Sequence, residues 1–409
     1  MEWFSRGIAV RLAAALTLVV AVGCTAGHKM VAPTPDVPDP SASSTTAPRF
    51  PDPGKDPLPA EKVAALQAVL DGLVAEDAQL KRGGFPDPPD VVSGVTAAVL
   101  SDRGSWSGAA GRCDDGSPLT PSTMMAIGSI SKTFTAAEVL HLAGEGKLDL
   151  EAPLSKYLHH RLAGNGATVR QALNMTSGVS GEAELDAALS QVSADPERHW
   201  TPQQTLSVLK GRPARPGGRP VYSSANYLLL GMLVEQVSRQ PLAAALRADL
   251  IKPAGLVRVA VQDGERPTPP LAAPPRRLEL GSADGYLPSR AVASAGFSAA
   301  GMAADAPSLA RWGYQLYGAR VLSADLSHAM VVQQSADDIE FGTGYGLGTM
   351  LFHHLQFGIA DSVGHSGATP GYLALLTVVP ERHLSVAVLV PDEDKDIGSI
   401  MRKLFAVLR

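Results

Sequence analysis

The sequence predicts a mixed α/β (α+β) protein, in which one antiparallel β-sheet is built from both ends of the chain around an inserted all-helical subdomain. Residues 94–100 and 105–110 are two apolar runs separated by a short turn, which is typical of a β-hairpin. The stretch from 120 to about 320 has mainly helical apolar spacing, and strand patterns return only near residue 345. Because strand patterns flank a helical middle, we expect both sets of strands to share one sheet.

The remaining elements frame this sheet with helices. Residues 61–77 carry apolar side chains at helical spacing, so a helix is expected before the hairpin. Later strands are expected over 345–352, 372–379 and 384–390, with a turn at 380–383 and a final helix over 396–408. About 350 residues are long for one simple core, so residues 61–409 are expected to form one domain with two subdomains.

The first 23 residues have the pattern of a targeting segment. Arg6 and Arg11 precede an apolar run over 12–22, which is too short to span a bilayer and fits a signal peptide. The run ends at Gly23-Cys24 and resembles a bacterial lipoprotein signal, although a bulkier aliphatic residue is usual three positions before the cysteine. We expect lipidation at Cys24 and anchoring on the extracytoplasmic side of the cell membrane. The alternative is that this cysteine is incidental and cleavage falls elsewhere.

Residues 24–60 are expected to form a tether behind that anchor. The part from 31 to 59 is rich in Pro, Ser, Thr and Asp, and it cannot bury enough apolar surface to offset the entropy of ordering the chain. Such a segment stays extended and would let a folded domain stand away from a membrane.

Charge, cysteine and histidine content exclude other classes. The net charge of −5 is modest for 409 residues and no long basic run exists, so nucleic-acid binding is not expected. If the first cysteine carries lipid, Cys113 has no disulfide partner, and its turn-like surroundings favour a free structural thiol over a nucleophile. The doublets His159-His160 and His353-His354 lack a metal-ligand spacing and are expected at the surface, so no metal site is predicted.

The strongest chemical signal is the short motif Ser129-x-x-Lys132. Gly128 permits a tight turn between an extended approach over 124–127 and a helix running to about Gly144. Ser129 then lies in the first turn and Lys132 on the same face one turn later, which places an amine beside a weak nucleophile. Free N–H groups at a helix N-terminus also suit an oxyanion. The motif indicates acyl transfer through a serine ester; a capping serine with a solvated lysine is the alternative.

The same spacing occurs a second time and provides an internal control. Ser207-x-x-Lys210 lies inside a helix-like run over 201–210, with no glycine turn before the serine. We interpret this second pair as a helix surface without a catalytic role.

Two further clusters follow Ser129-x-x-Lys132 along the chain. Tyr222-x-Ser224 opens an apolar helix over 228–237. His365-x-Gly367 lies in a glycine-rich stretch that leads into a strand. The predicted architecture would bring both clusters to Ser129.

These three motifs, in this order, resemble those of the serine β-lactamase and penicillin-binding-protein superfamily. Within it, the class C β-lactamase-like branch fits best, which also includes D,D-peptidases, D-amino-acid peptidases and esterases. The resemblance covers about residues 61 to 409, because segments 147–153, 175–179 and 345–348 also resemble family blocks in family order. It implies no cofactor and no metal.

The resemblance implies a role for each catalytic residue. Ser129 would be the nucleophile, Lys132 would help to remove its proton, and Tyr222 would serve as general base or proton shuttle. A neighbouring lysine cation favours the phenolate form of a tyrosine. The backbone N–H groups of Ser129 and Ala368 would form the oxyanion hole.

Ser224, His365 and Gly367 would contact the substrate, and two of them depart from the family pattern. Ser224 replaces the usual Asn, which is longer and both donates and accepts hydrogen bonds. His365 stands where β-lactamases and D,D-peptidases mostly carry Lys, a permanent cation that can attract a substrate carboxylate. Two interpretations stay open: His365 gains charge below about pH 6.5 and docks a carboxylate, or its surroundings hold it neutral.

The sequence therefore predicts a serine hydrolase that acts through a covalent acyl-enzyme on ester, amide or cell-wall-peptide substrates, with poor hydrolysis of β-lactams. The alternative is a binding or sensor module of the same fold that holds peptidoglycan or β-lactam without turnover. The expected partners are a small-molecule or peptidoglycan-derived substrate and the membrane. The natural acyl donor and the oligomeric state stay open, because the loops at about 180–200 and 260–295 carry no readable pattern.

Overall fold

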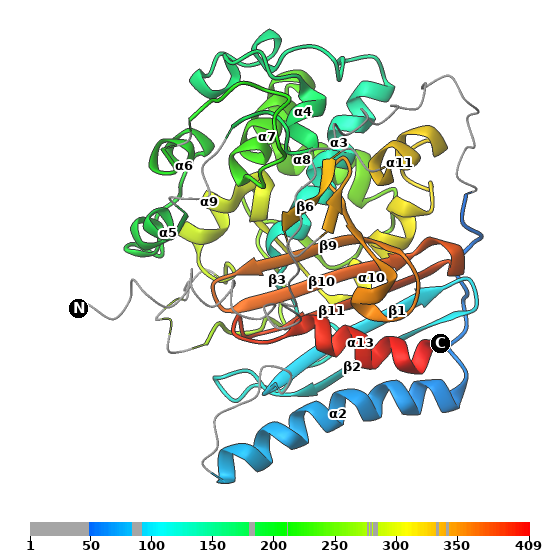
Figure 1. Cartoon of the computed structure of the whole chain (residues 1–409). Coiled ribbons are helices and arrows are strands. Elements are labelled where there is room, and N and C mark those ends of the chain that lie inside the picture. The colour runs from blue at the N-terminus through cyan, green and yellow to red at the C-terminus, as the bar shows by residue number, and fades with distance from the viewer. Residues whose placement is uncertain are drawn as a thin grey trace, which may run out of the picture. The chain divides into compact units, whose positions relative to one another are not determined.

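An eight-stranded antiparallel sheet forms the centre of the computed structural model, in the order β2-β1-β11-β10-β9-β8-β7-β6 (Figure 1). Strands from the two ends of the folded domain meet within this sheet, where β1 pairs with β11, so the predicted architecture is confirmed. The bounds are β1 (Gly94–Ser101), β2 (Gly104–Gly111), β6 (Ser335–Glu340), β7 (Thr343–Tyr345), β8 (Met350–Phe352), β9 (Ser362–Thr369), β10 (Tyr372–Val379) and β11 (Leu384–Val390).

The structure describes residues 49–83, 92–179, 185–210, 212–275, 278, 280, 285–332, 335–340 and 343–409. The predicted signal segment and most of the predicted tether lie outside these residues. None of the described helices has both the length and the apolar character needed to cross a membrane.

Helices cover the sheet and form a separate helical region above it in Figure 1. The longer ones are α2 (Ala60–Gly83), α3 (Ser131–Gly144), α5 (Leu185–Ser193), α7 (Ser224–Ser238), α9 (Arg290–Ala300), α10 (Ala306–Tyr317), α11 (Ala324–Val331) and α13 (Ile397–Leu408). The short ones are α4 (Val169–Leu173), α6 (Pro202–Val208), α8 (Leu242–Leu246), α12 (His354–Phe357), η1 (Gly128–Ile130), η2 (Leu154–Lys156), η3 (Arg161–Ala163), η5 (Arg247–Ile251) and η7 (Pro380–Arg382).

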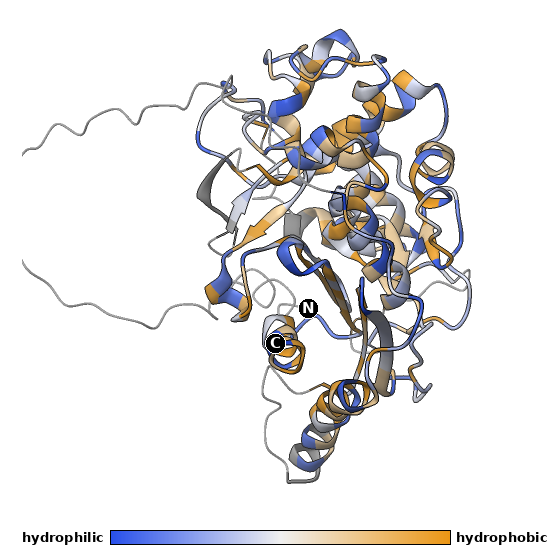
Figure 2. Cartoon of the chain, turned by 90° about the vertical axis from the view of Figure 1, so that its right-hand side faces the viewer, coloured by the Kyte–Doolittle hydropathy of each residue, from blue (hydrophilic) through white to orange (hydrophobic). Residues whose placement is uncertain are grey.

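The core lies on both faces of the sheet. Every residue of β11 is buried, and both α10 and α13 contact this strand. A strand buried along its whole length must be covered on both faces, so these two helices lie on opposite sides of it. The predicted first helix, α2, packs on β2 and α13, and Figure 2 shows hydrophobic and hydrophilic residues alternating along this lowest helix.

A second sheet of three short strands was not predicted from the sequence. It has the order β3 (Met125–Ala126), β5 (Met302–Ala304) and β4 (Val259–Val261). Strands of two or three residues are too short to show an alternating pattern, so the sequence could not reveal them. This sheet matters for function because β3 leads directly into the turn before Ser129.

Two sequence predictions need correction at their boundaries. The predicted strand 345–352 is two strands, β7 and β8, because residues 346–349 form a turn between them. The predicted tether ends earlier than residue 60, since Phe50 is only 5% exposed and its N–H donates to the carbonyl of Gly318 at 3.0 Å. The segment is polar as a whole, and this composition conceals the packing of the apolar Phe50 side chain against the domain.

Candidate active site

A tight turn positions Ser129 between β3 and α3. Gly128 has φ +49°, and a Cβ added there would lie 2.6 Å from the carbonyl oxygen and 2.7 Å from the amide nitrogen of Ala368 on β9. Only glycine fits both the left-handed backbone and this close approach. This turn is the short helix η1, which continues directly into α3. Helix α3 ends at Gly144, the residue that the sequence predicts.

Lys132 lies in the first turn of α3 and is completely buried. Its Nζ donates to Oγ of Ser129 at 2.9 Å, to Oγ of Ser224 at 3.3 Å and to the carbonyl oxygen of Ala299 at 3.1 Å. These contacts use the three donors of an ammonium group. The structure thus joins the first two sequence motifs through one side chain.

The carbonyl of Ala299 is a site feature that sequence reasoning missed. Helix α9 is interrupted at Phe297, which has φ 39° and ψ −121°. Past this kink, the carbonyl of Ser298 accepts from Oγ1 of Thr135 at 2.8 Å and that of Ala299 accepts from Lys132. Backbone carbonyls carry no side-chain signature, so only the glycines that bracket this segment, Gly296 and Gly301, hint at irregular backbone.

Two tyrosines lie beside the lysine. The Nζ atom of Lys132 is 4.9 Å from the ring centroid of Tyr222 and 5.8 Å from that of Tyr227. Complete burial raises the pKa of Tyr227 well above its usual value, so this phenol stays neutral, and it donates to the carbonyl of Leu173 at 2.9 Å. Tyr222 is half-buried just before α7, next to Lys132 as predicted.

Strand β9 brings the third motif to the same turn, although the motif lies within this strand and not before it. A Cβ added at Gly367 would lie 2.0 Å from the carbonyl oxygen of Ile127 and 3.2 Å from the amide nitrogen of Ser129. Two backbones therefore meet with no side chain between them. Ala368 is exposed, and β8 pairs with β9 only at residues 362–364, so the later part of β9 borders the site.

His365 is completely buried in the wall of the site. Its Nδ1 lies 2.5 Å from the carbonyl oxygen of Ser366, and its Nε2 lies 3.0 Å from the hydroxyl of Tyr345. Burial, helped by the nearby charge of Lys132, lowers the pKa of His365 to about 3. This pKa favours the interpretation in which the surroundings hold His365 neutral over the one in which it becomes charged below pH 6.5. In the sequence, Tyr345 belongs to the family-like segment 345–348 and carries no signal for this role.

The predicted helix surface is confirmed for Ser207 of the control pair but not for Lys210. Ser207 is exposed on α6, where its hydroxyl donates to the carbonyl of Gln204 at 2.8 Å. Lys210 lies beyond the end of that helix and is exposed. Cys113 is buried and is a free cysteine, also as predicted.

Three of the four doublet histidines are exposed, as predicted. The fourth, His160, is half-buried, and its Nδ1 accepts from the N–H of Leu162 at the start of η3.

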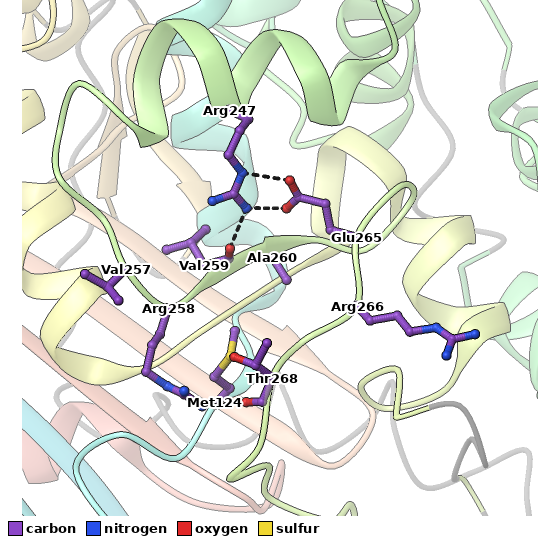
Figure 3. Close-up of a pocket in the computed structure, with 9 residues that line it drawn as sticks. All are labelled: Met124, Arg247, Val257, Arg258, Val259, Ala260, Glu265, Arg266 and Thr268. Carbon is purple, nitrogen blue, oxygen red and sulfur yellow. Dashed lines mark hydrogen bonds and ion pairs between the residues drawn. The ribbon is translucent and has the colours of Figure 1, made fainter.

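A separate hollow lies beside β4 (Figure 3). Arg247 donates through Nε to Oε1 of Glu265 at 2.7 Å, through its terminal nitrogen to the other carboxylate oxygen, and to the carbonyl of Val259 at 2.8 Å. Arg258 is likewise bonded to backbone carbonyls. These guanidinium groups are already paired and no predicted site residue lines the hollow, so the candidate active site is the one around Ser129.

Comparisons with known proteins agree with this geometry. The chain is 28% identical over 334 residues to penicillin-binding protein 4 of Amycolatopsis lactamdurans, covering 73% of this chain and 80% of that one. It is 33% identical over 141 residues to a D-aminopeptidase of Brucella anthropi, although that match covers 34% of this chain and only 26% of the relative. The crystal structure of a D-stereospecific amidohydrolase from Streptomyces sp. superposes with TM-score 0.67 at 27% identity, covering 84% of this chain and 98% of that one.

The family itself is shown by a match over most of the domain. The sequence model of the Beta-lactamase family matches residues 85–399. This range contains the turn at Ser129, the start of α7 and strand β9, which supply all three motifs. The chain belongs to the Beta-lactamase family, within the serine β-lactamase and penicillin-binding-protein superfamily of serine hydrolases.

Proposed function

We propose that this chain hydrolyses amides or esters through a covalent acyl-enzyme on Ser129. The observation that carries the proposal is the 2.9 Å contact between Nζ of the buried Lys132 and Oγ of Ser129. The contact occurs at a turn that Gly128 holds against β9. A solvated surface lysine would supply neither this contact nor a water-poor environment.

Acylation follows from the positions of these groups. Ser129 Oγ attacks the substrate carbonyl carbon and loses its proton to Tyr222, as in the class C-like arrangement that the sequence predicts. The ammonium of Lys132, 4.9 Å from the centre of the Tyr222 ring, stabilises the negative charge involved. Tyr222 then returns the proton to the leaving nitrogen or oxygen as its bond to the carbonyl carbon breaks.

The backbone at Gly128 and Gly367 supports the charge that develops on the carbonyl oxygen. We assign the N–H groups of Ser129 and Ala368 to the oxyanion hole, because the two glycines let these segments approach each other closely. One such donor contributes about 3–4 kcal/mol in comparable sites. Water then attacks the ester carbonyl, the bond to Oγ breaks, and Ser129 regains a proton as the carboxylic acid leaves.

The substrate class follows from His365. Where β-lactamases and D,D-peptidases mostly carry a cation, this chain has a buried imidazole that stays neutral near pH 7. We therefore propose acyl donors without a carboxylate at that position, and poor turnover of β-lactams. Amides and esters of D-amino acids are the first substrates to test, because the Streptomyces structure is of a D-stereospecific amidohydrolase and the Brucella anthropi relative is a D-aminopeptidase.

The test is a screen of matched amides and esters of D- and L-amino acids, together with a fluorescent penicillin. Turnover of at least one uncharged amide or ester, faster than that of penicillin, would support the proposal. A label that forms and stays would instead favour a covalent sensor. The absence of both label and turnover would favour a module that only holds peptide.

We also propose that lipid attached to Cys24 places the domain at the extracytoplasmic face of the cell membrane. Support comes from the sequence, where the apolar run over 12–22 ends at Gly23-Cys24. The change Cys24→Ala should prevent incorporation of a radiolabelled fatty acid and leave an unprocessed precursor on a gel. Processing of the wild type that globomycin does not inhibit, with no lipid label, would contradict the proposal.

A further inference from the structure

The loop between β8 and β9 carries a cluster of side chains outside the active site. His353, His354 and Asp361 are all exposed, and one possible ligand atom from each lies within 4.8 Å of the others. Among the described residues, no other group of three histidine, cysteine or acidic side chains comes together in this way. The sequence pattern missed this cluster because its third member lies seven residues beyond the doublet.

The distances within the cluster suit a metal ion. Two atoms bound to one tetrahedral Zn²⁺ at 2.0–2.1 Å lie about 3.3 Å apart. Nδ1 of His354 and Oδ1 of Asp361 are 3.2 Å apart, and the N–H of His354 donates to the same oxygen at 2.7 Å, which orients the carboxylate. The ring centroids of His353 and His354 are 4.1 Å apart, and one ligand nitrogen of His353 lies within 4.8 Å of the other two ligand atoms.

We propose that His353, His354 and Asp361 bind a divalent transition-metal ion, for which Zn²⁺ is the probe. Imidazole nitrogen and carboxylate oxygen are both good ligands for Zn²⁺, and three protein ligands leave one position for water. Neither the acyl chemistry nor the substrate class enters this proposal.

The metal would fasten the two ends of one loop. His353 directly follows β8 and Asp361 directly precedes β9, so the ion closes a short ring between neighbouring strands. Closing a short loop in the folded state stabilises it against local opening. Strand β9 also carries His365 and Ala368, so we expect Zn²⁺ to raise the thermal midpoint of the domain.

The experiment is a Zn²⁺ titration of the full chain by calorimetry, after chelator treatment and with an affinity tag that contains no histidine. We expect one Zn²⁺ per chain and a higher Tm in its presence. His354→Ala and Asp361→Asn should each weaken binding about tenfold or more. The matched control is the double change His159→Ala and His160→Ala, because that doublet belongs to no three-ligand group among the described residues.

The outcomes separate clearly. The site is supported if the His159→Ala and His160→Ala control still binds Zn²⁺ while His354→Ala and Asp361→Asn both lose binding. The proposal is overturned if the wild type does not bind Zn²⁺. It is also overturned if Asp361→Asn keeps the wild-type affinity or if the control variant loses it. The change Ser129→Ala should leave Zn²⁺ affinity unchanged, so failure of the proposed hydrolase function would not affect this result.

Discussion

The Nε2 atom of His365 accepts a hydrogen bond from the hydroxyl of Tyr345 at 3.0 Å. Nδ1 faces the carbonyl of Ser366 and must carry the proton that this carbonyl accepts, and the lowered pKa of His365 leaves Nε2 without a second proton, so Nε2 is the acceptor. The imidazole is therefore in its neutral Nδ1–H form, and Tyr345 positions it. A second proton on Nε2 would require Tyr345 to accept where it now donates, and would place a buried cation near Lys132.

The pH dependence of substrate binding tests this relationship. Because the pKa of His365 is lowered to about 3, the residue stays neutral from pH 5 to 8. For a matched pair of acid and ester substrates, the KM of the acid should not fall relative to that of the ester as pH falls through 6.5. His365→Lys, if the buried site accepts the cation, should tighten the acid selectively by about tenfold, equal to about 1.4 kcal/mol. A wild-type KM for the acid alone that improves below pH 6.5 would refute a neutral His365.

A buried acid on the catalytic helix predicts how stability depends on pH. Glu138 on α3 is completely buried, and no N–H or O–H donor of the described residues reaches its carboxyl oxygens. Burial raises the pKa of Glu138 to about 8, and the nearby carboxylates of Asp249 and Glu145 act in the same direction. The charge of Lys147 opposes this shift. The neutral acid can donate to Asp249, whereas an ionised one would repel it.

The direction in which folding stability changes with pH follows from proton binding to Glu138. Between about pH 4.5 and 8, folded Glu138 keeps a proton that the unfolded chain releases, so folding stability falls as pH rises through this window. Glu138→Gln should therefore be more stable than wild type by about 4 kcal/mol at pH 8, with the difference vanishing near pH 4. Urea unfolding at both pH values measures this, with the exposed Glu76→Gln as control. Equal effects of the two changes at pH 8 would argue against a buried neutral Glu138.

Backbone packing at the oxyanion hole predicts a large effect from one methyl group. In Gly367→Ala, the new Cβ would lie 2.0 Å from the carbonyl of Ile127, so β9 must move away from Ser129. We expect kcat to fall by about 100-fold or more, the loss typical of one misplaced oxyanion donor. Gly218→Ala, whose Cβ would meet nothing within 4 Å, is the control. Circular dichroism establishes folding, and a folded variant with normal kcat would show that Ala368 is not in the oxyanion hole.

The sequence predicted the parts of the fold that have strong periodicity. Strands β10 and β11 have the predicted bounds, and α3 ends at Gly144, because long apolar runs and glycine mark these elements directly. It also identified Ser129, Lys132 and Tyr222, which the structure places together.

What the sequence could not reveal depends on tertiary contacts. The carbonyl of Ala299 that accepts from Lys132 has no side-chain signature, and the burial of His365 is a property of the folded wall. The open choice between a charged and a neutral His365 could be decided only by the bonds to Tyr345 and Ser366. Polar composition also concealed Phe50, whose packing needs Gly318, a residue far away in the chain.

The most direct measurement is the intact mass, with peptide mapping, of the protein trapped by a fluorophosphonate. The account predicts a single adduct on Ser129, which Ser129→Ala abolishes together with all turnover. Ser207→Ala, at the exposed copy of the same motif, should keep both labelling and turnover within about twofold, because surface changes of this kind cost under ~0.5 kcal/mol. An adduct on any other residue, or equal loss of activity in the two variants, would contradict the assignment of Ser129 as the nucleophile.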